Sequence, residues 1–195
     1  MALDIEANAE AHAELIRAAG ARLITFPELS LTGYELENAP SITVDSPVLQ
    51  PIVDACARSR STALVGAPIG QGGAHHIAML AVNGSGTEIA FRKMWLGGEE
   101  ATFFAAGDQP AVLDLNGVRF GLAICKDTGT PRHAVDTAAL GMDCFGVYVA
   151  FASFAGPTGS GYGQTAGCSG IWDRRGVLVA TAGPDADRIV VATLT

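Results

Sequence analysis

The sequence predicts a layered α/β fold around one sheet-based core, and three observations support this. Helical and strand-like segments alternate in the first half of the chain, hairpin signals follow, and short β-type runs fill the end. Of the 195 residues, 49% are hydrophobic and 16% are charged, which is enough apolar material for one sizeable core. We therefore expect a single domain over residues 1–195. Periodicity does not decide between one sheet and two packed sheets.

The chain begins with a predicted helix and strand. DIEANAEAHAELIRAA (4–19) is rich in Ala and Glu and is followed by Gly20, which favours a helix that ends at a left-handed glycine. ARLITF (21–26) is short, apolar and partly β-branched, so it predicts a strand that runs into the loop at Pro27. Glu28 therefore lies where a strand gives way to a loop.

Helix and strand then alternate again. SPVLQPIVDACARSR (46–60) places apolar residues at helical spacing, and TALVGAPI (62–69) predicts another short strand before Pro68.

Two hairpins are predicted in the middle of the chain. HHIAMLAV and TEIAFRK flank the turn sequence NGSG (83–86), and the second of these strands ends near Lys93. A second turn at Asn116-Gly117 joins AVLDL to VRFGLAIC (118–125). This assignment puts Cys125 at the C-terminal end of a strand.

The remainder of the chain contains one more predicted helix and several β-type runs. TPRHAVDTAALG (130–141) has Pro131 in its first turn and Gly141 at its end, as helices prefer. The Gly-rich stretch 156–167 is expected to be a loop. Short β-type runs are predicted at 146–154, 168–172, 177–182 and 188–194.

The composition argues against several classes of partner. Lys and Arg total 12 against 20 Asp and Glu, a net charge of -8, and no basic run suits nucleic acid or an anionic membrane. No apolar run reaches the ~18 residues of a membrane span, and we see no secretory signal at the N-terminus. The cysteine and histidine spacings match no metal site or disulfide framework. We expect a cytoplasmic protein without a cofactor that acts on a small molecule.

Three predicted strand ends carry residues that could do chemistry together. Glu28, Lys93 and Cys125 would supply a carboxylate, an ammonium and a thiol if their strands were neighbours. Such a trio suits acyl transfer from an amide or nitrile carbon, with Glu28 taking the thiol proton. The Lys93 ammonium and the backbone N–H of Lys126 would stabilise the charge that develops, so Lys126 is a candidate oxyanion-binding residue.

Each of these residues also has a structural interpretation. A cysteine that ends an apolar strand is usually a small core residue. Glu28 could be a turn or helix-cap carboxylate, and Lys93 could be one of many solvated lysines at strand ends. From the residues alone, both interpretations stay open.

The order of three segments resembles a known family. FPELSLTGY (26–34), RKMWLGGEEATFFAAG (92–107) and GLAICKD (121–127) are similar to the signature segments of the carbon-nitrogen hydrolase, or nitrilase, superfamily, in its amidase-like branch. The likeness extends to residues 4–24 and 169–183. It implies a four-layer αββα sandwich that assembles as a homodimer or larger homo-oligomer.

The resemblance also implies site residues. The family's Glu-Lys-Cys triad falls on Glu28, Lys93 and Cys125, and its second glutamate precedes the closing Gly107 by seven positions, at Glu100. The implied activity is thiol-dependent hydrolysis of a non-peptide carbon-nitrogen bond, first of all in a small linear amide. N-carbamoyl compounds and nitriles are alternative substrates, and a catalytically silent binding or scaffold protein is the alternative from another class.

Two elements of the family pattern lack a counterpart in the sequence. The chain opens almost directly at the first helix, without the usual leading strand, and a strand-loop-helix unit is missing between Cys144 and Phe145. Either the unit is absent from the protein or residues are omitted at that junction. Its absence would leave apolar surface uncovered and would put substrate binding in doubt.

Overall fold

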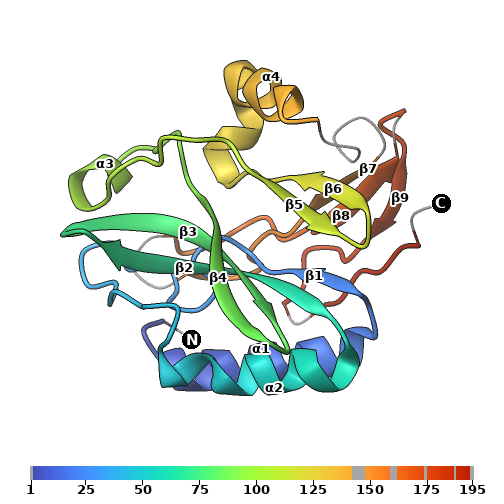
Figure 1. Ribbon diagram of the computed structural model, residues 1–195, viewed down its shortest axis with the longest axis horizontal. Coiled ribbons are helices and arrows are strands. Elements are labelled where there is room, and N and C mark those ends of the chain that lie inside the picture. Colours follow the sequence, from blue (N-terminus) through green and yellow to red (C-terminus); the bar gives the residue numbers. More distant parts are fainter. Residues whose placement is uncertain (1, 142–147, 159–161, 174, 187, 194–195) are drawn as a thin grey trace.

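Helices and sheets stack in four layers in the computed structural model of the chain (Figure 1). Helices α1 (Ile5–Ala19) and α2 (Gln50–Ser59) form one outer layer, and helix α4 (Pro131–Ala139) lies on the opposite side of the molecule. Two layers of sheet lie between them. The structure describes residues 2–141, 148–158, 162–173, 175–186 and 188–193.

The larger sheet has the strand order β1-β2-β3-β4. Its strands are β1 (Leu23–Thr25), β2 (Thr62–Gln71), β3 (Ala74–Asn83) and β4 (Gly86–Arg92). The β1 and β2 strands pair in parallel, and the pairs β2-β3 and β3-β4 are antiparallel. The turn at 83–86 therefore closes the hairpin that the sequence predicted.

The second layer of strands consists of two smaller sheets. One is the hairpin of β5 (Val112–Leu115) and β6 (Val118–Gly121), and the other has the order β7-β8-β9. The latter strands are β7 (Tyr148–Phe151), β8 (Gly170–Asp173) and β9 (Leu178–Thr181). Three short helices complete the described elements: η1 (Pro47–Leu49), α3 (Glu100–Phe103) and η2 (Cys125–Gly129).

Apolar residues bury both faces of the larger sheet, because successive side chains of a strand point to opposite faces. On one face, Val65 and Leu80 pack with helices α1 and α2 in a first hydrophobic cluster. On the other face, Leu64 and Ile77 belong to a second cluster that includes Leu122 of the segment after β6. The long, apolar β2 and β3 strands are thus sandwiched between two cores, which explains the layered arrangement.

Local sequence signals account for the first helix. The side chain of Asp4 accepts a hydrogen bond from the backbone N–H of Ala7, and Gly20 adopts a left-handed conformation at the C-terminus with φ 57°. The predicted helix at 4–19 is confirmed with nearly the same bounds.

The prediction that a strand ends before Pro68 is wrong. The β2 strand continues through Pro68 to Gln71 and pairs with β3 from Ala63 to Gln71. The Pro68 carbonyl accepts a hydrogen bond from the N–H of Ile42, on the edge of β2 that lies away from β3. The missing N–H of proline faces the same way, so no bond to β3 is lost.

Two further assignments differ from the structure. The strand predicted over 118–125 ends at Gly121, and Cys125 instead begins the 3₁₀ helix η2. The β-type run predicted at 188–194 forms no strand over its described residues, 188–193. Short β-branched runs satisfy strand propensity, but the strand forms only where a neighbouring strand is available to pair with.

Gly66 allows the loop that carries Glu28 to lie directly against β2. A Cβ atom on Gly66 would lie 2.3 Å from the carbonyl oxygen of Pro27 and 2.4 Å from the backbone nitrogen of Leu29. The Gly66 carbonyl also accepts a hydrogen bond of 3.0 Å from the N–H of Leu31. The position of Glu28 thus depends on a glycine in the adjacent strand.

We expect Gly66→Ala to lower the free energy of unfolding by about 1–3 kcal/mol, because the new methyl group overpacks this contact. The matched control is Gly163→Ala, since a Cβ at Gly163 would meet nothing within 4 Å. Urea denaturation of the two variants provides the comparison. Equal stability of both variants would show that the Glu28 loop does not depend on close packing at Gly66.

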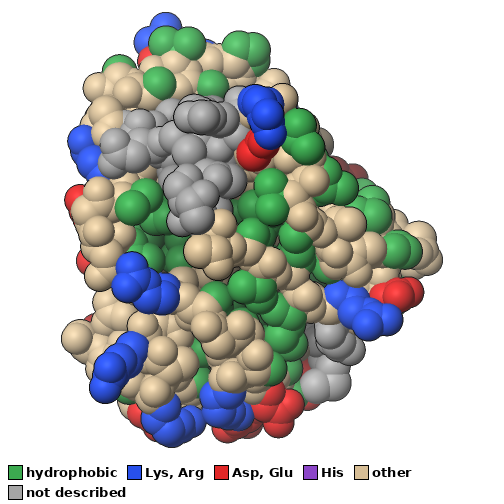
Figure 2. All heavy atoms as spheres, turned by 90° about the vertical axis from the view of Figure 1, so that its right-hand side faces the viewer, with side chains coloured by type: hydrophobic (Ala, Val, Ile, Leu, Met, Phe, Trp, Pro, Cys, Tyr) green, Lys and Arg blue, Asp and Glu red, His purple; other side chains and the backbone are tan. Residues whose placement is uncertain are grey.

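The β7-β8-β9 sheet leaves apolar side chains exposed. Val149, Phe151, Leu178 and Val179 are all exposed, and Figure 2 shows apolar side chains spread over the side of the molecule on which these strands lie. The junction between Cys144 and Phe145 lies outside the described residues.

None of the described helices has the length and apolar character needed to cross a membrane.

Candidate active site

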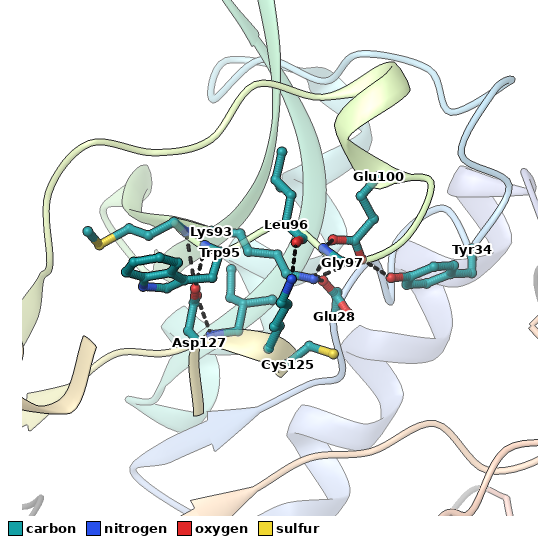
Figure 3. Close-up of polar contacts among 12 residues, drawn as sticks. Glu28, Tyr34, Lys93, Trp95, Leu96, Gly97, Glu100, Cys125 and Asp127 are labelled. Carbon is teal, nitrogen blue, oxygen red and sulfur yellow. Dashed lines mark hydrogen bonds and ion pairs between the residues drawn. The ribbon is translucent and has the colours of Figure 1, made fainter. Parts of the chain in front are cut away.

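A buried lysine held between two carboxylates lies at the centre of the site (Figure 3). Lys93 follows directly after β4, and the residue is 1% exposed. Its Nζ lies 2.7 Å from Oε1 of Glu28 and 2.7 Å from Oε2 of Glu100. The structure thus brings together three residues that the sequence separates by up to 72 positions, and Glu100, not the exposed Glu99, contacts the lysine.

Glu100 is held in place from several sides. It is 3% exposed and is the first residue of α3. Its Oε2 accepts a hydrogen bond of 2.7 Å from the backbone N–H of Gly97, and its Oε1 accepts a short hydrogen bond from the hydroxyl of Tyr34. With two such donors and the Lys93 ammonium, the carboxylate has little freedom to reorient.

Cys125 presents its thiol beside this cluster. The residue is exposed, and in Figure 3 its sulfur lies on the side of Glu28 and Lys93. Its backbone has φ 47°, in the left-handed region that residues other than glycine rarely adopt. Strained backbone of this kind persists only where its surroundings hold it, and it is concentrated at functional sites. The turn between β6 and η2 therefore offers the thiol to the solvent next to a carboxylate and an ammonium.

The electrostatics keep the lysine charged and the thiol protonated. Burial alone would lower the pKa of Lys93, but Glu28 and Glu100 outweigh it and hold that pKa above its usual value. Atoms packed around the sulfur, together with the charge of Glu28, raise the pKa of Cys125, and Lys93 offsets part of the rise. At neutral pH the resting thiol therefore keeps its proton and needs a base at the moment of attack.

Glu28 is the carboxylate that lies beside this thiol. Burial raises its pKa, while the Lys93 ammonium and the nearby Cys125 thiol lower it in part. A carboxylate whose proton affinity is raised accepts a proton more readily than an ordinary surface glutamate.

Lys126 uses its side chain in a way that the sequence did not predict. Although the residue is exposed, its Nζ donates a hydrogen bond of 2.7 Å to the carbonyl oxygen of Leu96.

Two residues of the site were missed by the sequence analysis. Tyr34 closes FPELSLTGY, and burial together with the nearby Glu28 carboxylate raises the pKa of its phenol well above the usual range. The phenol therefore stays protonated as a donor to Glu100. Asp127 is 1% exposed and accepts hydrogen bonds from three backbone N–H groups. Both lie inside the quoted segments, but only their contacts reveal what they do.

The Gly-rich loop also reaches the edge of the site. The carbonyl oxygen of Thr158 accepts a hydrogen bond of 3.1 Å from the N–H of Tyr34, and the rings of Tyr34 and Tyr162 lie 5.4 Å apart between centroids. Within the described residues, no group of three or more His, Cys, Asp or Glu side chains is arranged to hold a metal ion.

Comparisons with known proteins identify one matching family. Residues 1–145 match the carbon-nitrogen hydrolase family. No curated protein sequence matches the chain significantly.

Several solved structures share the fold. An amidase from Nesterenkonia sp. AN1, in a form with acrylamide added to its active-site cysteine, has a TM-score of 0.84 at 20% identity, covering 99% of this chain and 89% of that one. Another form of that amidase carries the acetamide moiety of fluoroacetamide on the same cysteine, at a TM-score of 0.84 and 21% identity, covering 100% and 86%. Nit3 of Saccharomyces cerevisiae, in branch 10 of the nitrilase superfamily, has a TM-score of 0.81 at 20% identity, covering 97% and 84%. The predicted four-layer fold is confirmed.

Proposed function

Because the chain belongs to the carbon-nitrogen hydrolase family, we propose that it hydrolyses the carbon-nitrogen bond of a small linear amide through a thioester on Cys125. The observation that carries this proposal is the contact of Lys93 with both Glu28 and Glu100, with the Cys125 thiol beside them. A buried ammonium with a base and a thiol at its side is what acyl transfer from an amide requires.

The first half of the reaction forms the thioester. Glu28 takes the proton of the Cys125 thiol as the sulfur attacks the amide carbon, and the carbonyl oxygen becomes an oxyanion. The Lys93 ammonium and the backbone N–H of Lys126 stabilise that oxyanion. Glu28 then gives the proton to the nitrogen, the carbon-nitrogen bond breaks, and ammonia or an amine leaves.

The second half hydrolyses the thioester. Glu28 takes a proton from a water molecule as it attacks the thioester carbon, and the same donors stabilise the second oxyanion. The carbon-sulfur bond breaks, the thiolate regains its proton from Glu28, and a carboxylic acid leaves. The balance is one amide and one water consumed for one acid and one amine or ammonia released.

Other residues keep the reacting groups in place. Tyr34 and the Gly97 N–H hold Glu100, and Glu100 holds the ammonium in its charged form. The choice of a small amide is supported by the Nesterenkonia amidase, whose active-site cysteine carries adducts of two small amides.

The test is ammonia release from a panel of small amides, N-carbamoyl amino acids and nitriles. We expect turnover of at least one amide, and a loss of that turnover in Cys125→Ala to the level of the uncatalysed reaction, because no thioester can form. The matched control is Cys168→Ala, which removes another exposed thiol and should keep full activity. Unchanged turnover in Cys125→Ala would reject the mechanism, and no turnover in the whole panel would favour a silent binding protein.

A further inference from the structure

The two residues that follow Cys125 reach across to the loop that follows Lys93. Asp127 and Lys126 lie in η2, and between them they bind the backbone of residues 94–96. The nucleophile turn and the lysine loop are thus joined by side chains next in sequence to the thiol.

Asp127 provides the buried part of this connection. Its Oδ1 accepts hydrogen bonds from the backbone N–H groups of Met94 at 3.2 Å and Trp95 at 2.8 Å. Its Oδ2 accepts from the N–H of Ile124, directly before the nucleophile, at 3.0 Å. One carboxylate therefore ties the residue before Cys125 to the two residues after Lys93.

Lys126 provides the exposed part. Its Nζ donates to the carbonyl oxygen of Leu96 at 2.7 Å. The next residue of the loop, Gly97, donates its N–H to Glu100, which itself pairs with the Lys93 ammonium. Each residue from 94 to 97 is consequently held by a charged side chain of the site.

We propose that Lys126 and Asp127 form a clamp that sets the position of the Lys93 ammonium relative to the Cys125 sulfur, and that both act as positioning residues for the reaction. The proposal rests on the proposed function for its kinetic consequences, while its structural claim can be tested without turnover. The Lys93 side chain bonds Glu28 and Glu100, and its backbone bonds Ile77 and Gly107, neither of which belongs to the nucleophile turn.

This position matters for both steps of the reaction. The ammonium has to lie near the oxyanion as it develops, and a displacement of about 1 Å can cost as much as a hundredfold in rate. The charged groups that act on the Cys125 thiol are Glu28, Lys93 and Glu100, and Lys93 alone among them favours the thiolate. A looser clamp would therefore weaken oxyanion stabilisation and make the thiol harder to ionise.

The first test compares Lys126→Met with Lys126→Arg. Met keeps the aliphatic stem but cannot donate to Leu96, so we expect kcat to fall about tenfold to a hundredfold with little change in KM. Arg can donate to the same carbonyl and should restore most of the rate. Arg132→Met is the control for charge, because it removes an exposed cation from the first turn of α4 and should leave kcat unchanged.

The second test uses Asp127→Asn and follows the alkylation of Cys125 by iodoacetamide as a function of pH, with the exposed Cys168 as internal standard. An Asn side chain cannot accept all three hydrogen bonds, since one of its two polar atoms is a donor. Removing a negative charge would by itself ease ionisation of the thiol and shift its reaction to lower pH. The clamp predicts the opposite sign, a shift to higher pH, because the Lys93 ammonium moves away.

The outcomes separate the clamp from a general loss of structure. A shift to lower pH, or no shift, in an Asp127→Asn protein with wild-type circular dichroism would overturn the proposal, as would an unchanged kcat in Lys126→Met. If Asp127→Asn does not fold, the pH dependence of Cys125 alkylation is compared between Lys126→Met and Lys126→Arg. The clamp then predicts a shift to higher pH in Lys126→Met and no shift in Lys126→Arg. A shift in a protein that turns over no amide would support the clamp and reject the proposed function.

Discussion

Lys93→Met is expected to abolish activity and to destabilise the fold together. Removing a donor to an oxyanion costs about 10²–10³ in kcat, and the remaining partners cannot replace a buried ammonium. The loss also leaves Glu28 and Glu100, both largely buried, facing each other without a counter-charge. Breaking a buried ion pair by removing one partner costs about 3–5 kcal/mol. Urea denaturation at pH 7 measures that loss, and ammonia release measures the activity.

The destabilisation of Lys93→Met should depend on pH. Without the ammonium, the two carboxylates repel, and the pKa of Glu28, already raised by burial, should rise further in the folded state. A raised carboxyl pKa means that stability is present at low pH and is lost as the pH rises through the folded pKa. The variant should therefore be closer to wild type at pH 5 than at pH 7.

A second substitution supplies the control for this experiment. Lys93→Met combined with Glu100→Gln should recover part of the stability, because one of the two uncompensated charges is gone, but it should recover no activity. Wild-type stability of the single variant at pH 7 would contradict the view that Lys93 is held as a buried ion.

Glu28→Gln is expected to lower kcat/KM by about 10²–10⁴, the usual contribution of a general base. The amide of glutamine can still accept a hydrogen bond from Lys93 but cannot take the thiol proton. In the wild-type protein the pKa of Glu28 is raised, mainly by burial, so activity should fall on the acid side at a pH above the ordinary value of 4.5 for a glutamate. A pH profile of kcat/KM locates this acid limb.

The sign of this pH dependence identifies the base. As the pH falls through the pKa of Glu28, the carboxylate takes a proton from the solvent and can no longer take one from Cys125. The residual activity of Glu28→Gln should therefore lack this acid limb. Glu99→Gln is the matched control, since Glu99 is exposed and should leave both rate and profile unchanged. An acid limb that persists in Glu28→Gln would assign the base to another group.

Local sequence patterns correctly predicted most of the elements. The Ala- and Glu-rich run with its terminal Gly20 forms α1, and the turn sequences at 83–86 and 116–117 close hairpins, because capping and turn chemistry act between residues close in sequence. The wrong strand assignments lie where a segment distant in sequence decides whether a strand forms. Pro68 is tolerated because of the direction its backbone faces, and 188–193 remain unpaired despite their β-branched residues.

The sequence by itself determined the fold class, the order of the three signature segments and the candidates Glu28, Lys93, Glu100 and Cys125. Only the tertiary structure decided that the lysine is buried between both carboxylates, that Tyr34 holds one of them, and that η2 rather than a strand presents the thiol. The tertiary structure alone also decided that Lys126 and Asp127 bind the loop after Lys93. Apart from the Lys93–Glu100 pair, which is 7 positions apart, these contacts join residues at least 30 positions apart. Periodicity and propensity carry information about neighbours in sequence alone, whereas close packing of the layers sets which distant side chains meet.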